Sequence, residues 1–90
     1  MDINNPVVQT AVLGKQAEDF LGSDLGKYLI KRAEQEASEA IDGLRRIEAH
    51  KADEIRSLQT KLWRAESFQQ WLGNAIVEGQ EALKMLEDGD

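Results

Sequence analysis

Residues 30–47 read IKRAEQEASEAIDGLRRI, and this stretch decides the fold. Its apolar residues are spaced alternately by three and four positions, which is the heptad pattern of a helix that packs along one seam. The seam consists of Ile30, Ala33, Ala37, Ala40, Leu44 and Ile47. Because alanine occupies most of its centre, another helix can approach closely there. The stretch therefore predicts a long helix, over residues 24–47, with a closely packed helical partner.

The partner helix is predicted further along the chain, over residues 52–87. The same alternation of three and four recurs there at Ile55, Leu58, Leu62, Ala65, Gln69, Leu72, Ile76, Gly79, Leu83 and Leu86. Neither proline nor glycine marks the connection over residues 48–51. We place it there because the seam loses its phase and Asp53 and Glu54 suit the first turn of a helix. Two long helices with matching seams and a short connection predict an antiparallel helical hairpin.

A short first helix is predicted over residues 6–21. Asn5 is a good N-cap, and Pro6 is tolerated at the first helical position. Apolar residues follow at roughly helical spacing, interrupted only by Gly14, at Val8, Val12, Leu13, Ala17, Phe20 and Leu21. We therefore predict an all-α fold over residues 1–90, a single domain with a short N-terminal helix and a long antiparallel helical hairpin.

The boundary between the first two predicted helices lies at residues 22–24. Gly22 suits the C-terminal end of a helix, and Ser23 or Asp24 can cap the N-terminus of the next. Within the second helix, Asp42 and Arg46 are spaced for an i,i+4 ion pair. Gly26, Gly43 and Gly79 weaken their helices, so each indicates either close helix packing or a local kink.

The third predicted helix carries more apolar surface than one seam can use. A second apolar stripe lies beside the seam and consists of Phe68, Trp71, Ala75 and Ala82. Together the seam and this stripe are wider than the roughly 100° of an ordinary buried helix face. The first helix would cover part of this width, and a second copy of the chain or another protein would cover the rest. We therefore expect an oligomer or a complex, with a contact surface formed by Trp63, Phe68, Trp71, Ala75, Val77 and Ala82.

The two tryptophans are the most informative side chains of that surface. Trp71 lies on the second stripe, which favours burial in the core over contact with a partner. Trp63 and Val77 project roughly opposite the seam. Trp63 is therefore either covered by the first helix or an oligomer, or it anchors a partner protein.

Composition argues against an enzyme. The chain has no Cys, which excludes disulfides, thiolate metal sites and Cys nucleophiles. It has one His, His50, and no Glu-x-x-His pair, nucleophile elbow or glycine-rich phosphate loop. We expect no catalytic site, no cofactor and no metal site. In a chain of 90 residues the core is thin, and such helical chains often oligomerise.

The charge distribution bears on partners. The net charge is −6, and phosphate backbones repel an acidic chain, so general nucleic-acid binding is disfavoured. The acidic C-terminal third either keeps the chain in solution or docks on a basic groove. A basic cluster at the predicted hairpin tip includes Arg45, Arg46 and Arg56. These arginines either pair with Glu48, Asp53 and Glu54, or contact nucleic acid or an acidic partner.

No apolar run is long enough to span a membrane. The first residues are polar and acidic, so we expect no signal peptide and a protein that stays in the compartment where it is made.

Three strings of sequence carry a resemblance to a known group. They are LGKQAEDFL at 13–21, SDLGKYL at 23–29 with Arg32-Ala33 after it, and AESFQQWL at 65–72 with Ala75-Ile76 after it. Over residues 13–79 the chain resembles small, uncharacterised proteins of tailed bacteriophages and prophages, encoded among head-assembly and DNA-packaging genes. The connection departs from the Asp- and Pro-rich loop of that group. The resemblance implies a phage origin and a virion-assembly context, but no catalytic residues.

We therefore expect a non-enzymatic helical protein–protein interaction module of phage origin, an accessory or structural factor in head assembly or DNA packaging. It would act in the host bacterial cytoplasm or on the virion, bound to a phage structural protein or a host protein. One alternative is an acidic inhibitor of a host defence or nucleic-acid enzyme. Another is a weak DNA-binding packaging factor that uses the basic tip.

Overall fold

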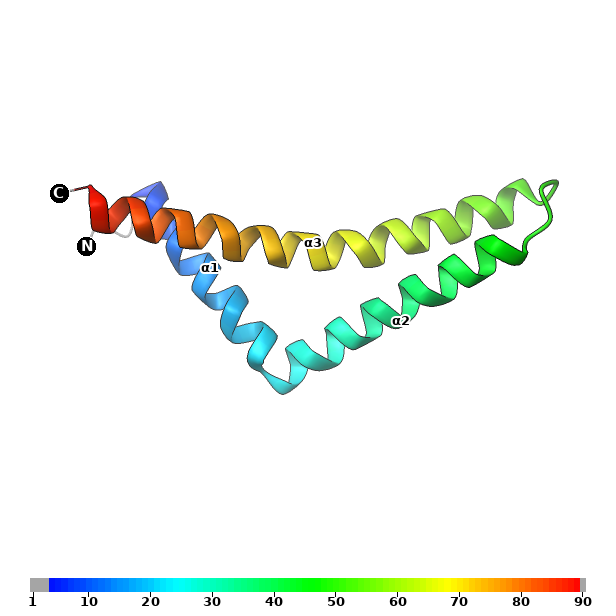
Figure 1. The fold of residues 1–90 in the computed structure, drawn as a ribbon, viewed down its shortest axis with the longest axis horizontal. Coiled ribbons are helices and arrows are strands. Elements are labelled where there is room, and N and C mark those ends of the chain that lie inside the picture. The colour runs from blue at the N-terminus through cyan, green and yellow to red at the C-terminus, as the bar shows by residue number, and fades with distance from the viewer. Residues whose placement is uncertain (1–3, 90) are drawn as a thin grey trace. The chain divides into compact units, whose positions relative to one another are not determined.

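The computed structural model describes residues 4–89 of the chain, and this part contains three helices and no strand (Figure 1). Helix α1 spans Pro6–Gly22, α2 spans Asp24–Arg46 and α3 spans Ala52–Asp88. Each bound lies within one residue of its predicted position. The all-α fold with a short first helix and a long hairpin is thereby confirmed.

The helices form two compact units, which are described separately. Unit 1 contains residues up to 27 and from 71 onward, and unit 2 contains residues 28–70. Unit 1 therefore holds α1 and the second half of α3. Unit 2 holds most of α2, the connection and the first half of α3.

The start of α1 and the turn into α2 follow from local hydrogen bonds. The Asn5 side-chain oxygen accepts a hydrogen bond from the Val7 N–H at 2.9 Å, and Pro6 is the first helical residue. Ser23 caps α2, since its hydroxyl accepts a hydrogen bond from the Gly26 N–H at 3.0 Å. The turn needs glycine at position 26, because a Cβ there would overlap the carbonyl oxygen of Phe20. Helix α1 ends at Gly22 as predicted, but Gly22 does not adopt a left-handed conformation and the C-cap residue is Ser23.

Unit 2 is the antiparallel hairpin. Contacts between α2 and α3 run in opposite directions along the chain, from Glu36 with Arg64, through Glu39 with Lys61, to Gly43 with Leu58. The predicted seam is buried or half-buried along its length, and its least exposed residues are Ala33, Ala40 and Ala65. A Cβ at Gly43 would lie 3.0 Å from a methyl carbon of Leu58, which shows how closely the helices approach.

In unit 1, α1 crosses the second half of α3 at a contact between two glycines. A Cβ added to Gly14 would lie 2.6 Å from the Cα of Gly79 and 2.8 Å from the carbonyl oxygen of Ala75. A Cβ added to Gly79 would lie 2.6 Å from the Cα of Gly14. The two backbones therefore touch directly, and any side chain at either position would force the helices apart.

This crossing corrects two expectations about α1. Gly14 does not interrupt the packed face but lies at its centre, between buried Ala11 and Ala17. Val12 and Leu13, which were expected on that face, are 48% and 59% exposed. The reason is that residues buried at every third position form a row oblique to the helix axis. A close crossing along such a row selects the smallest side chains.

The seam of α3 is also wrong near its end. Leu83 is 46% exposed, whereas its neighbour Ala82 is 4% exposed and packs inside unit 1. The seam residues predicted on either side, Gly79 and Leu86, remain buried or half-buried. The spacing after Gly79 is therefore three and then four, because α1 meets α3 on the side where Ala82 lies.

The core that results is made almost entirely of small side chains. In the described residues its buried hydrophobic members are Val8 and alanines at positions 11, 17, 33, 40, 65 and 82, and no large side chain is fully buried. Burying one methyl group stabilises a fold by about 0.8 kcal/mol, against about 1.5–3 kcal/mol for a Leu or Phe side chain. Both units therefore bury little apolar surface of their own.

Candidate interaction surfaces

Many large apolar side chains are exposed at the surface of both units. In unit 1 the exposed ones are Val12, Leu13, Leu25, Trp71, Val77, Leu83 and Met85, and in unit 2 they are Tyr28, Ile41 and Trp63. Soluble proteins ordinarily bury residues of these types and leave small ones to fill gaps. Here the buried apolar residues are almost all alanine, larger residues such as Leu58 and Leu62 are only half-buried, and both tryptophans are exposed.

The predicted contact residues divide between surface and core. Trp63 is 63% exposed and Val77 is 53% exposed, while Phe68 and Ala75 are half-buried. Ala82 is buried against α1, so it is not part of the exposed surface.

The interpretation that favoured a core position for Trp71 is wrong, because its side chain is 61% exposed. Helix α1 meets α3 at Gly79, about two helical turns beyond Trp71. The first helix therefore does not cover this ring within unit 1.

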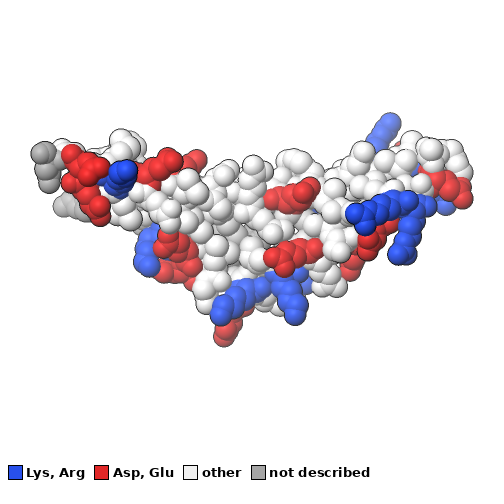
Figure 2. All heavy atoms as spheres, viewed as in Figure 1, with Lys and Arg blue, Asp and Glu red and all other residues white. Residues whose placement is uncertain are grey.

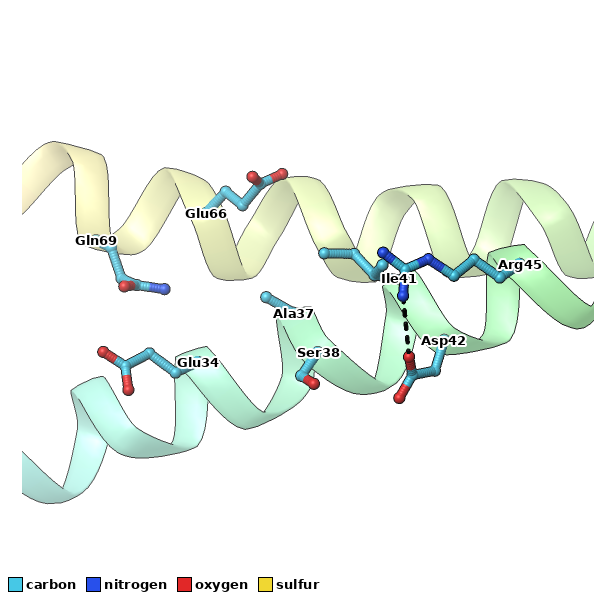
Figure 3. A pocket seen from close by; sticks show the side chains of 8 residues that line it. All are labelled: Glu34, Ala37, Ser38, Ile41, Asp42, Arg45, Glu66 and Gln69. Carbon is cyan, nitrogen blue, oxygen red and sulfur yellow. Dashed lines mark ion pairs between the residues drawn. The ribbon is translucent and has the colours of Figure 1, made fainter.

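A groove of about 580 Å³ lies between α2 and α3 in unit 2 (Figure 3). Ala37 and Ile41 point from α2 toward α3, and the Gln69 side chain points back toward α2. Charged groups stand around this apolar centre. The lining residues are Glu34, Ala37, Ser38, Ile41, Asp42, Arg45, Glu66 and Gln69.

A second groove of unit 2, of about 460 Å³, is more aromatic. Tyr28 and Phe68 line it together with Arg32 and the Glu36–Arg64 ion pair, whose closest atoms are 3.7 Å apart. Neither groove brings together residues that resemble a catalytic constellation. Both are open apolar depressions bordered by charge, the kind of surface that binds other proteins.

Among the basic residues near the hairpin tip, Arg45 has a partner other than those predicted. Arg45, Arg46 and Arg56 are all exposed. Asp42 pairs with Arg45 at 3.8 Å, not with Arg46 as expected. Glu48 lies 3.4 Å from the ring of His50.

Two further cations of unit 2, Lys61 and Arg64, reach across to α2. The Lys61 ammonium lies 3.3 Å from the Glu39 carboxylate, and the Arg64 guanidinium lies 3.7 Å from that of Glu36. Sequence spacing alone could not show these pairs, since they depend on the register of the hairpin. The basic tip is thus partly neutralised within the unit.

The ion pair between Lys61 and Glu39 makes the stability of the fold depend on pH. Hydrogen bonds from Lys61 and Gln35 hold the pKa of Glu39 below its ordinary value of 4.5. A lowered pKa in the folded protein stabilises it above pH 4.5, and this contribution is lost as the pH falls through the lower value. We expect the free energy of unfolding, measured by urea denaturation, to fall less in Glu39→Gln than in the wild type when the pH drops below 4.5. Lys61→Gln should have the same effect, and an unchanged acid dependence in both variants would contradict the assignment.

The net negative charge of the chain is carried by unit 1, whereas the charges of unit 2 balance. Residues 28–70 hold eight acidic and eight basic residues, whereas the remainder of the chain holds nine acidic and three basic residues. The net charge of −6 therefore falls entirely in unit 1. Figure 2 shows acidic side chains grouped on the visible face of α1 and of the second half of α3.

Among residues 4–89, no group of three His, Cys, Asp or Glu side chains is placed to hold a metal ion. In the same part of the chain, no helix combines the length and apolar character needed to cross a membrane. Comparison with protein-family models, with curated proteins and with solved structures finds no match to this chain.

Proposed function

We propose that this chain is a helical protein–protein interaction module without enzymatic activity. Its partner is a second protein that covers the exposed apolar faces, and the chain oligomerises or forms a complex in order to work. In its specific form the proposal is an accessory or structural factor in phage head assembly or DNA packaging, in the host cytoplasm or on the virion. That specific form rests on the resemblance of residues 13–79.

One observation carries the proposal. Trp63, Trp71 and Met85 are each more than 60% exposed, while the buried core is alanine apart from Val8. Tryptophan and methionine are enriched where proteins bind one another. A side chain that is exposed alone and buried in a complex contributes its hydrophobic stabilisation to binding instead of to folding.

A second candidate function is favoured by the charge of unit 1. Its excess of carboxylates suits docking on a basic channel, as in an acidic inhibitor of a host defence or nucleic-acid enzyme. Loss of a nuclease activity on addition of the chain, with no effect on head assembly, would favour this alternative. The DNA-binding alternative has less support, because the charges of unit 2 balance and Arg45 is paired with Asp42.

The experiment is co-purification with phage head and packaging proteins, followed by light scattering and titration. We expect Trp63→Ala and Trp71→Ala each to weaken the complex about tenfold or more, the usual effect of removing an aromatic anchor. The matched controls are Gln70→Ala in unit 2 and Asn74→Ala in unit 1, both at exposed positions of α3. They should bind within about twofold of the wild type.

A chain that stays a monomer and binds none of these proteins would contradict the proposal. So would tryptophan variants that bind as tightly as the two controls.

A further inference from the structure

A groove of about 330 Å³ lies between α1 and the second half of α3, inside unit 1. Its apolar part comes from Val7 of α1 and from Ala82 and Met85 of α3. The carboxylates of Glu78 and Glu81 border it, and both side chains are exposed. The groove therefore combines an apolar floor with an acidic rim.

The same character continues along α3. Trp71, Glu78 and Met85 follow one another at intervals of seven residues, about two helical turns, so they share one face of the helix. Trp71 and Met85 are each 61% exposed. Along this face, large apolar side chains alternate with a carboxylate. A helix with apolar and basic residues at matching spacing would complement it.

A second, separate observation is that positive charge would be stabilising at the C-terminal end of α3. Its last turn contains Glu87 and Asp88 and no basic residue. The C-terminus of a helix carries a partial negative charge, so carboxylates there are unfavourable and cations are favourable. Cations supplied by a partner would offset this repulsion as well as the net charge of −6 that unit 1 carries.

We propose that this groove of unit 1 receives one face of an amphipathic helix that carries lysines or arginines and belongs to a different protein. Trp71 and Met85 contact its apolar side chains, and Glu78 and Glu81 pair with its cations. A second copy of unit 1 is disfavoured as occupant, because it would place like net charges against each other. The inference rests on the proposed interaction function and adds the chemistry of the partner.

The test uses the full chain and a fluorescein-labelled helical peptide of about 15 residues, a length at which helices begin to be stable. The peptide presents leucines at i, i+3 and i+7 with lysines beside them. We expect Glu78→Gln with Glu81→Gln to weaken binding about tenfold, measured by fluorescence anisotropy. The control pair, Asp53→Asn with Glu54→Gln, makes the same charge change at exposed α3 positions of unit 2. It should change affinity less than about twofold. A peptide with alanine in place of leucine should bind weakly to every variant.

Equal weakening by the two pairs of substitutions would overturn the inference, because it would show only general attraction between opposite charges. Failure of the wild type to bind the peptide would overturn it too, as would a homodimer that Glu78→Gln and Glu81→Gln strengthen. If the chain still forms its complex with a head or packaging protein, the proposed function stands and only this inference falls. If neither the peptide nor any such protein binds, both fall.

Discussion

Replacing Ala40 by glutamate should destabilise the protein by about 3 kcal/mol or more. Ala40 is 0% exposed and lies in the contact between α2 and α3 of unit 2. A glutamate there would bring a charge and four further heavy atoms into a site sized for one methyl group. The measurement is urea unfolding followed by the helical circular dichroism signal, with the free energy extrapolated linearly to water.

The matched control is Ala52→Glu. Ala52 is exposed and is the first residue of α3, where a carboxylate is favoured by the helix dipole. This variant should unfold within about 0.5 kcal/mol of the wild type. If Ala40→Glu unfolded at the same urea concentration as Ala52→Glu, the alanine seam would not be the core of unit 2.

Replacing Gly79 by alanine should lower the free energy of unfolding by about 1–3 kcal/mol. In an open helical position the same change would raise it by about 1 kcal/mol, because alanine is the better helix former. At Gly79 the new Cβ would lie 2.6 Å from the Cα of Gly14, which is backbone and cannot rotate away. The helices would therefore have to separate, with loss of contact around Ala11 and Ala82.

Gly73→Ala is the control, since a Cβ at Gly73 meets no atom within 4 Å. It should stabilise the protein by about 0.5–1 kcal/mol. Gly14→Ala should resemble Gly79→Ala. The double variant should cost less than the two separate losses added together, because one separation of the helices accommodates both methyl groups. Stabilisation by Gly79→Ala would contradict the glycine contact.

Much of the fold could be predicted because its signals are local. Asn5, Pro6 and Ser23 act through hydrogen bonds and dihedral angles within a few residues, so their roles are readable from sequence. The seam of α2 repeats regularly, and its alanines correctly indicate a close approach. The hairpin of unit 2 followed from two matching seams and a short connection.

The packing of unit 1 could not be predicted in the same way. A hydrophobicity pattern weights Val12, Leu13 and Leu83 above Gly14 and Ala82, yet a glycine contact reverses that ranking. The geometry of the crossing decides which residues are buried, and no local signal encodes it. The exposure of Trp71 has the same origin. A helix pair in contact through small residues leaves the large ones beside the contact instead of beneath it.

The location of the acidic residues could be predicted from the sequence, but the partners in the ion pairs could not. The acidic C-terminal third was evident, and it belongs to the unit that carries the whole net charge. The choice of Arg45 over Arg46 as partner of Asp42 is a matter of rotamers on the surface, where such pairs contribute little. The pairs of Lys61 and Arg64 with α2 required the three-dimensional register.

The measurement that tests the central claim most directly is acrylamide quenching of tryptophan fluorescence in two single-tryptophan chains. Trp71→Phe leaves only Trp63, and Trp63→Phe leaves only Trp71. In the isolated chain both rings should be quenched readily, since they are 63% and 61% exposed. In the complex with its partner protein, quenching of at least one of them should fall sharply. Rings that are already protected in the isolated monomer, or that stay equally accessible in the complex, would contradict the account.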